Sequence, residues 1–447
     1  MSDTKPLKRI LGTPTAWLIG MGVAIGSGIF RTPGEVAGVL GTPWLIIAAW
    51  LAAGLVVLLQ GLVTAELATR FPRAGGEYVY LREAYGEFVA FFFGWAYTIF
   101  IIGGSVAAIA AAFGDFTSDL VQVDPAVWSG PLAAAAIVAI TGINTIGLRV
   151  GAGAQNALTV IKIVALLAMI VLGLSLGSGI AARPTTAPAS GASGIAFLPL
   201  FIGAMLPALW AYDGTTDSVK MAEEIKDVLR ALPRAIVGAT LTLIVLYVLV
   251  NVAVLRILSP AEMAGHASAP GEAMSRLFGP KGRNAMLIVA MVACLGSVSS
   301  TMLATIRVTF ALARDGLAFG FMSRMSRTQA PVPALLIVAA FAIVLALNRD
   351  FRQMLNIYFF AAAILFGLSY GSLIVFRWRE RERSERVFRC PFGPILSAAL
   401  ILFQLALAVN IAWNEPKDML YTSMLLLVIG GFYLVWKRFA GTTRASE

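Results

Sequence analysis

Long apolar runs dominate the chain, and short polar segments separate them. A run of more than about 18 residues without charged side chains predicts a helix that crosses a membrane. On this rule we place twelve spans, near residues 14–37, 43–67, 88–113, 131–149, 153–176, 197–221, 234–256, 285–311, 331–347, 354–376, 394–413 and 420–436. The pattern therefore predicts an all-α polytopic membrane protein with twelve transmembrane helices.

Composition supports this interpretation and excludes others. Of the 447 residues, 59% are hydrophobic and 13% are charged, whereas soluble domains are about half apolar and about a quarter charged. Soluble multidomain, disordered, coiled-coil and nucleic-acid-binding classes are excluded. Cys294, in an apolar run, and Cys390, in a basic loop, cannot form a disulfide framework.

The net charge of +10 comes mainly from short loops between the apolar runs. With a cytosolic N-terminus, roughly 24 basic residues fall on the inner side and roughly 9 on the outer side, a bias that sets orientation. We therefore expect both termini in the cytosol, with residues 1–13 and 437–447 as cytosolic segments. The first apolar run continues past any cleavage site, so it predicts a mature helix rather than a signal peptide.

Two apolar runs are interrupted. Residues 20–30 (GMGVAIGSGIF) contain closely spaced glycines and a serine, and residues 209–217 (LWAYDGTTD) form a polar stretch in the sixth span. Glycines alone also suit a helix-packing face. If residues 14–176 and 197–376 are two halves of an inverted repeat, however, the breaks occupy matching positions. Matching breaks predict a transporter binding site.

These motifs resemble a known family. The string at residues 20–30 resembles the helix 1 motif of the amino acid–polyamine–organocation transporters, and residues 65–67 with 71–81 resemble their helix 2–3 signature. Further motifs resemble the L-type amino acid transporter branch: residues 210–214, 223–226, 232–236, 155–156 with Lys162, and 313–316 with 331–334. The resemblance runs in order from about residue 8 to about residue 437.

The resemblance implies a five-plus-five inverted repeat with two peripheral helices at residues 394–436. The substrate then lies between the broken helices 1 and 6, with backbone amides near Gly28 for its carboxylate and carbonyls near Ala24 and Ile25 for its ammonium. The expected binding residues are Ile25, Gly26, Ser27, Gly28, Ile29, Trp210, Ala211, Asp213, Gly214 and Thr215.

Three of these residues raise separate questions. Asp213 is either an N-cap for the outer half of helix 6, accepting from the amides of Thr215 or Thr216, or a group that attracts the substrate ammonium directly or through water. Trp210 is expected to gate the pocket or form its wall. Thr215 departs from the tryptophan that many relatives carry there, which leaves the preferred substrate size open.

Lys162 lies in the middle of an apolar span, too deep for its side chain to reach water easily. In sodium-driven relatives of the implied fold, helix 1 carbonyls and helix 8 hydroxyls hold a sodium ion. We expect Lys162, with Ser297 and Ser300, to substitute for that ion.

The expected function is therefore sodium-independent exchange of neutral L-amino acids by alternating access. The alternatives are a proton-coupled transporter of amino acids, amines or polyamines, and a transporter-like amino acid sensor. An enzyme is not expected, because His266 has no obvious acidic neighbour in the sequence and Glu223 and Glu224 fit a solvated helix end or an inner gate.

We expect no cofactor, no metal and no nucleic acid, only the substrate and membrane lipid as partners. Residues 114–130, the expected outer loop between helices 3 and 4, contain no cysteine. In some animal members such a cysteine binds a glycoprotein, so no disulfide-linked heavy chain is expected here. The expected location is the plasma membrane, with a bacterial inner membrane as the preferred interpretation.

Overall fold

The computed structural model describes residues 9, 11–146, 148–179, 197–264, 266–326, 331–348, 351–380 and 387–444. Ten helices in these ranges are long and apolar enough to cross a membrane, and a bent pair, α1 with α2, provides an eleventh span. Val332–Asn348 is apolar but shorter. The all-α polytopic fold is confirmed, while the count of twelve spans stays a prediction.

The helices follow one another with short connections. Their bounds are α1 (Thr13–Ala24), α2 (Gly28–Leu40), α3 (Pro43–Arg70), α4 (Glu77–Tyr85), α5 (Glu87–Ala96), the π-helix η1 (Tyr97–Gly103), α6 (Gly104–Val121), α7 (Pro125–Ile146), α8 (Leu148–Leu176), α9 (Phe197–Tyr212), the 3-10 helix η4 (Asp217–Glu224), α10 (Val228–Leu255), α11 (Pro260–Ala264), α12 (Ala269–Arg314), the 3-10 helix η5 (Gly320–Ser323), α13 (Val332–Asn348), α14 (Phe351–Arg379), α15 (Gly393–Asn414) and α16 (Pro416–Arg444).

Several helices extend beyond the apolar runs that predicted them. The third span continues to Val121 and α7 begins at Pro125. The connection between them is therefore residues 122–124, and the expected loop at 114–130 is wrong. Likewise, α16 continues to Arg444, through most of the expected tail. Hydropathy detects the apolar part of a helix but not its polar ends. Most of the expected N-terminal segment lies outside the described residues.

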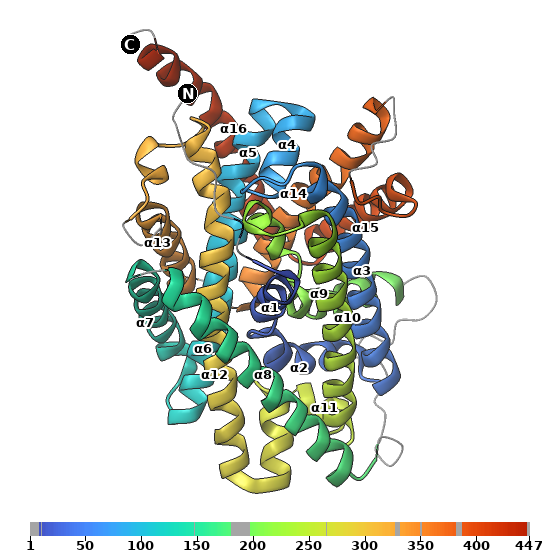
Figure 1. Ribbon diagram of the computed structural model, residues 1–447. Coiled ribbons are helices and arrows are strands. Elements are labelled where there is room, and N and C mark those ends of the chain that lie inside the picture. The colour runs from blue at the N-terminus through green and yellow to red at the C-terminus, as the bar shows by residue number, and fades with distance from the viewer. Residues whose placement is uncertain are drawn as a thin grey trace.

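The broken helix α1–α2 lies in the middle of the bundle (Figure 1). The first part, α1, packs against α8, α10 and α12, whereas α2 packs against α9 and α11. The later helices α15 and α16 pack on the outside, mainly against α14 and α5. On α16, Leu427 and Val428 are 75% and 66% exposed, as expected for side chains that face lipid. The division into halves at 14–176 and 197–376 stays a prediction.

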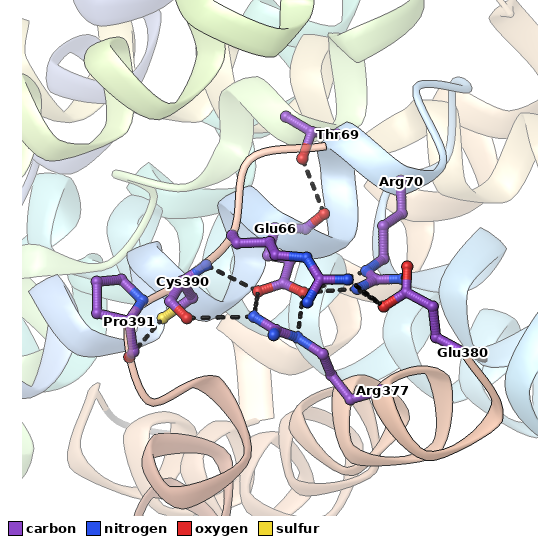
Figure 2. A network of polar contacts seen from close by, with 8 residues as sticks. Glu66, Thr69, Arg70, Arg377, Glu380, Cys390 and Pro391 are labelled. Atoms are coloured by element: carbon purple, nitrogen blue, oxygen red, sulfur yellow. Dashed lines mark hydrogen bonds and ion pairs between the residues drawn. The ribbon is translucent and has the colours of Figure 1, made fainter. Parts of the chain in front are cut away.

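A buried carboxylate fixes one end of the bundle (Figure 2). Glu66 of α3 is fully buried and accepts hydrogen bonds from Nε and Nη2 of Arg377, both at 2.7 Å. It also accepts from Nη2 of Arg70 at 2.8 Å and from the backbone amide of Cys390 at 2.8 Å. Cys390 is therefore buried rather than in an open basic loop. Both cysteines of the chain are buried and free.

We expect Glu66→Gln to lower stability strongly. Loss of one partner of a buried ion pair typically costs about 3 to 5 kcal/mol, because it leaves a buried charge uncompensated. The matched control is Glu83→Gln, whose exposed pair with Arg73 (3.4 Å) should contribute about 1 kcal/mol or less. Thermal denaturation of the purified variants in one detergent measures the difference. Equal melting temperatures for the two variants would contradict the role of Glu66.

Candidate binding site at the two helix breaks

Both predicted breaks are present. The helix α1 ends at Ala24, α2 begins at Gly28, and the two axes differ by 49°. In the sixth span, α9 ends at Tyr212 and η4 begins at Asp217. Gly214 adopts a φ of +93°, a backbone conformation that side chains other than glycine rarely adopt. The interrupted runs therefore predicted real interruptions of the helices.

The two breaks lie against each other. A Cβ atom on Gly28 would be 2.4 Å from Cα of Ala211, and one on Gly214 would be 2.3 Å from Cγ1 of Val23. Neither position has space for a methyl group. Glycine therefore serves close packing and the helix breaks at the same time, so the two interpretations of the glycine string are not exclusive.

Side chains from three helices hold the C-terminal end of α1. The ammonium Nζ of Lys162 on α8 donates to the Gly22 carbonyl at 3.2 Å, and the Ser297 hydroxyl on α12 donates to the Val23 carbonyl. The Tyr247 hydroxyl on α10 donates to the Ala24 carbonyl at 3.1 Å. Lys162 has no exposed surface. A cation at this position also suits the negative end of the helix dipole.

This arrangement changes part of the sequence prediction. Lys162 and Ser297 meet at the end of α1 as expected, but the Ser300 hydroxyl bonds to its own helix, at the Gly296 carbonyl (2.8 Å). The Ala24 carbonyl was expected to be free for a substrate ammonium, yet Tyr247 occupies it. Tyr247 was missed because a tyrosine in an apolar run carries no signal of its partner.

Aromatic side chains cover one side of the break. Nε1 of Trp210 donates to the Ser27 hydroxyl at 3.2 Å, and its ring makes edge contacts with Tyr358 (5.3 Å between centroids) and Phe351 (6.2 Å). The guanidinium of Arg31 lies 4.4 Å from the centroid of Phe351 and pairs with Asp115 of α6. Trp210 therefore forms a wall of the site, as expected, and Arg31 fastens the layer beyond it to α6.

Asp213 has a partner that the sequence did not predict. Its Oδ2 accepts a hydrogen bond from the Tyr358 hydroxyl of α14 at 2.7 Å. The helix η4 begins after Thr216, four residues beyond the end of α9, rather than directly at the break. The expected cap on Thr215 or Thr216 is therefore wrong in this structure. Asp213 instead links the sixth span to α14.

A cavity that is partly open to solvent lies between the broken helices, η1, α6, α12 and α14. Its lining includes six of the expected site residues: Gly26, Ser27, Gly28, Trp210, Asp213 and Ser297. The other expected residues, Ile25, Ile29, Ala211, Gly214, Thr215, Lys162 and Ser300, do not line it. Gly214 and Thr215 line a second hollow between α3, α9, α14 and α15.

The cavity also contains an ion pair that the sequence analysis missed. Lys220 lies at the end of the sixth apolar run, where a lysine resembles a loop charge. It is nevertheless 2% exposed, pairs with Asp217, and has its ammonium 5.3 Å from the Tyr97 ring centroid. Glu77 of α4 is also buried close to Lys220, and burial raises the pKa of its carboxyl. Asp217 and Lys220 are opposite charges three residues apart, directly after the second break. That spacing is the sequence signal from which the pair could have been predicted.

Two other expectations need correction. Glu223 and Glu224 do not form a solvated helix end: Oε2 of Glu223 accepts from the Ala74 amide at 3.1 Å, and Glu224 pairs with Arg307 at 2.7 Å. The alternative role of an inner gate stays a prediction. His266 has an acidic neighbour, since its Nδ1 lies 3.8 Å from Oε2 of Glu272. Within the described ranges, no three His, Cys, Asp or Glu side chains are placed to hold a metal ion.

Comparison with known proteins agrees with this geometry. The family model described as amino acid permease matches residues 11–434. The chain belongs to the amino acid permease family. It is 30% identical to the b(0,+)-type amino acid transporter 1 of Mus musculus over 99% of this chain and 91% of that protein. It is 29% identical to the serine/threonine exchanger SteT of Bacillus subtilis over 90% of this chain and 92% of that protein.

These relatives confirm the resemblance drawn from the motifs. Both are named as transport proteins of amino acids, and the family model covers nearly the whole chain. The permease is thus an amino acid transporter of the multi-pass membrane type and not an enzyme.

We expect Gly28→Ala to reduce amino acid uptake at least tenfold. The added methyl group would collide with the backbone of Ala211 and force the two breaks apart. The matched control is Gly104→Ala on α6, where a Cβ atom would meet nothing within 4 Å and alanine favours the helix. Uptake of labelled amino acids into vesicles, at equal amounts of inserted protein, tests this. Normal uptake by Gly28→Ala would contradict the close contact of the breaks.

Proposed function

We propose that the permease exchanges neutral L-amino acids across the plasma membrane, without sodium, by alternating access. The observation that carries this proposal is the fully buried Lys162 ammonium on the Gly22 carbonyl, beside the Ser297 hydroxyl on Val23. The covalently attached ammonium supplies a positive charge at the end of α1. A sodium ion is then not needed to satisfy these carbonyls.

The second half of the argument concerns the substrate. The first intrahelical bond of α2 joins the Arg31 amide to the Ser27 carbonyl, so the preceding amides point out of the helix end. These amides and the positive end of the helix dipole favour a carboxylate. Gly26, Ser27 and Gly28 line the cavity at this position. An α-amino acid supplies that carboxylate, whereas a polyamine does not.

If Lys162 replaces sodium, the sodium gradient does not drive transport. Without a coupled ion, uptake of one amino acid requires release of another or runs down its own gradient. Because one relative is named an exchanger, we infer obligatory exchange rather than transport down a gradient. From the excess of basic residues in alternate loops we infer that both termini lie in the cytosol. We also infer that the permease works without a disulfide-linked partner, since Cys294 and Cys390 are both buried.

Proton coupling is the second candidate function. The observation in its favour is that the buried Lys162 ammonium contacts a neutral carbonyl rather than a carboxylate. No carboxylate among the described residues holds the ammonium in place, so Lys162 could act as a proton carrier. Release of that proton during the transport cycle would couple amino acid uptake to a pH gradient.

Reconstituted vesicles separate these mechanisms. In sodium-free buffer, we expect uptake of labelled neutral amino acid to rise several-fold when the vesicles are preloaded with unlabelled amino acid. A strict requirement for sodium would refute sodium independence. Strong uptake into empty vesicles under an inward proton gradient, with no effect of preloading, would support proton coupling instead.

We expect Lys162→Ala to reduce transport at least tenfold while the protein still reaches the membrane. The substitution leaves the end of α1 without its cation, and the Gly22 carbonyl loses a charge-assisted hydrogen bond. Lys281→Ala is the matched control, because Lys281 is an exposed lysine on α12. Transport rates at equal surface amounts provide the measurement. Wild-type rates in Lys162→Ala would show that the lysine has no central role.

A further inference from the structure

One wall of the cavity is polar in a way that the exchange mechanism does not use. Asp217 and Lys220 of η4 and Thr301 of α12 line this wall, and Tyr97 of η1 and Thr305 of α12 lie beside them. These residues share the cavity with Gly26, Ser27 and Gly28 at the start of α2. A substrate held there by its carboxylate would therefore direct its side chain into the same cavity.

The Asp217–Lys220 pair offers both a donor and an acceptor to the cavity. Its side chains are 9% and 2% exposed, and the lysine stem packs on Gly76, where an added Cβ would lie 3.0 Å from Cγ. The Lys220 ammonium also lies over the Tyr97 ring. Because the two charges balance, the pair needs no ionic partner, yet an ammonium can donate further and a carboxylate can accept further.

Thr301 provides an unpartnered hydroxyl on the same wall. Its side chain is 4% exposed, and within the described part of the chain its Oγ1 forms no hydrogen bond. The neighbouring Ser300 hydroxyl, in contrast, bonds to the Gly296 carbonyl. A buried polar group without a partner is unfavourable. A ligand that supplies a hydrogen-bonding group would therefore be favoured at Thr301.

We propose that Asp217, Lys220 and Thr301 form a subsite for the substrate side chain, and that it selects amino acids with a hydroxyl or carboxamide group. This inference rests on the proposed exchange of neutral amino acids. A hydroxyl or carboxamide both donates and accepts, so it can pair with Asp217 or Thr301 and with Lys220. A purely aliphatic or aromatic side chain of similar size would leave the Thr301 hydroxyl unpaired and would add no hydrogen bond to Asp217 or Lys220. Sites built for hydrogen bonding strongly reject such analogues.

Charged side chains fit this wall less well than neutral polar ones. A carboxylate would meet Asp217 and Asp213 in the cavity lining, with Glu77 buried behind Lys220. An ammonium or guanidinium would meet Lys220 and would have to displace it from Asp217. Either charge disturbs a pair that is already balanced, whereas a neutral polar group adds hydrogen bonds to it.

The pair threonine and valine gives the sharpest test, because the two are isosteric and differ in the hydroxyl. Binding of labelled threonine to the purified permease in detergent is measured with threonine, valine, asparagine, leucine, glutamate and arginine as competitors. We expect threonine and asparagine to compete at least tenfold better than valine, leucine, glutamate and arginine. Equal competition by valine or by arginine would overturn the subsite.

Two variants test the residues themselves. Thr301→Val is isosteric and should reduce the threonine-to-valine preference at least fivefold while valine binding is retained. The double variant Asp217→Asn with Lys220→Met removes both charges and should shift preference toward leucine. Thr240→Val is the control, because its buried hydroxyl bonds to its own helix on α10. An unchanged preference in Thr301→Val would overturn the proposal, even if the double variant failed to fold.

Exchange measured on the same preparation keeps the two proposals apart. Exchange of valine as fast as threonine would overturn the subsite and leave sodium-independent exchange intact. Selective binding of threonine without any trans-stimulated exchange would overturn the exchange mechanism and leave the subsite intact.

Discussion

The end of α1 imposes the constraint on which the core of this permease depends. Inside a membrane no lipid can satisfy the carbonyls that a broken helix exposes. Here, three consecutive carbonyls, those of Gly22, Val23 and Ala24, receive donors from α8, α12 and α10. The break thereby ties together helices that are distant in the sequence. Any transport movement of α1 must carry these three helices with it or break their hydrogen bonds.

The two sides of the same break differ in a functional sense. The carbonyl side is satisfied by side chains of the protein, whereas the amides that precede Arg31 at the start of α2 face the cavity side lined by Ser27 and Gly28. A protein that used both sides for its own contacts would have no backbone groups left for a substrate. Because of this asymmetry, one helix break can stabilise the fold and still leave backbone amides free at the start of α2, where we propose that the substrate carboxylate binds.

The sequence predicted those features that differ from the residues next to them in the chain. Lys162 and the glycine string stand out because charge and backbone breaks are rare in apolar spans. The sequence did not predict the role of a residue whose hydrogen-bond partner is distant in the chain. Asp213 takes its hydrogen bond from Tyr358, 145 positions away, and no local pattern reveals that pairing. The roles of Asp217 and Lys220 were missed for another reason: charges at the end of an apolar run resemble loop charges, even when, as here, they are buried among other helices.

Lys162 and Lys220 are both buried, but they differ in the groups that contact them. Within the described residues, the Lys162 ammonium bonds to the Gly22 carbonyl and pairs with no carboxylate, so its charge acts on the backbone of α1. Lys220 faces Asp217, so its charge is balanced and the pair acts as a polar surface rather than as a cation. A net cation in the cavity wall would select anions, and a balanced pair does not. The presence of a neighbouring carboxylate therefore distinguishes Lys162, which bonds to the backbone of α1, from Lys220, for which we propose contact with the substrate side chain.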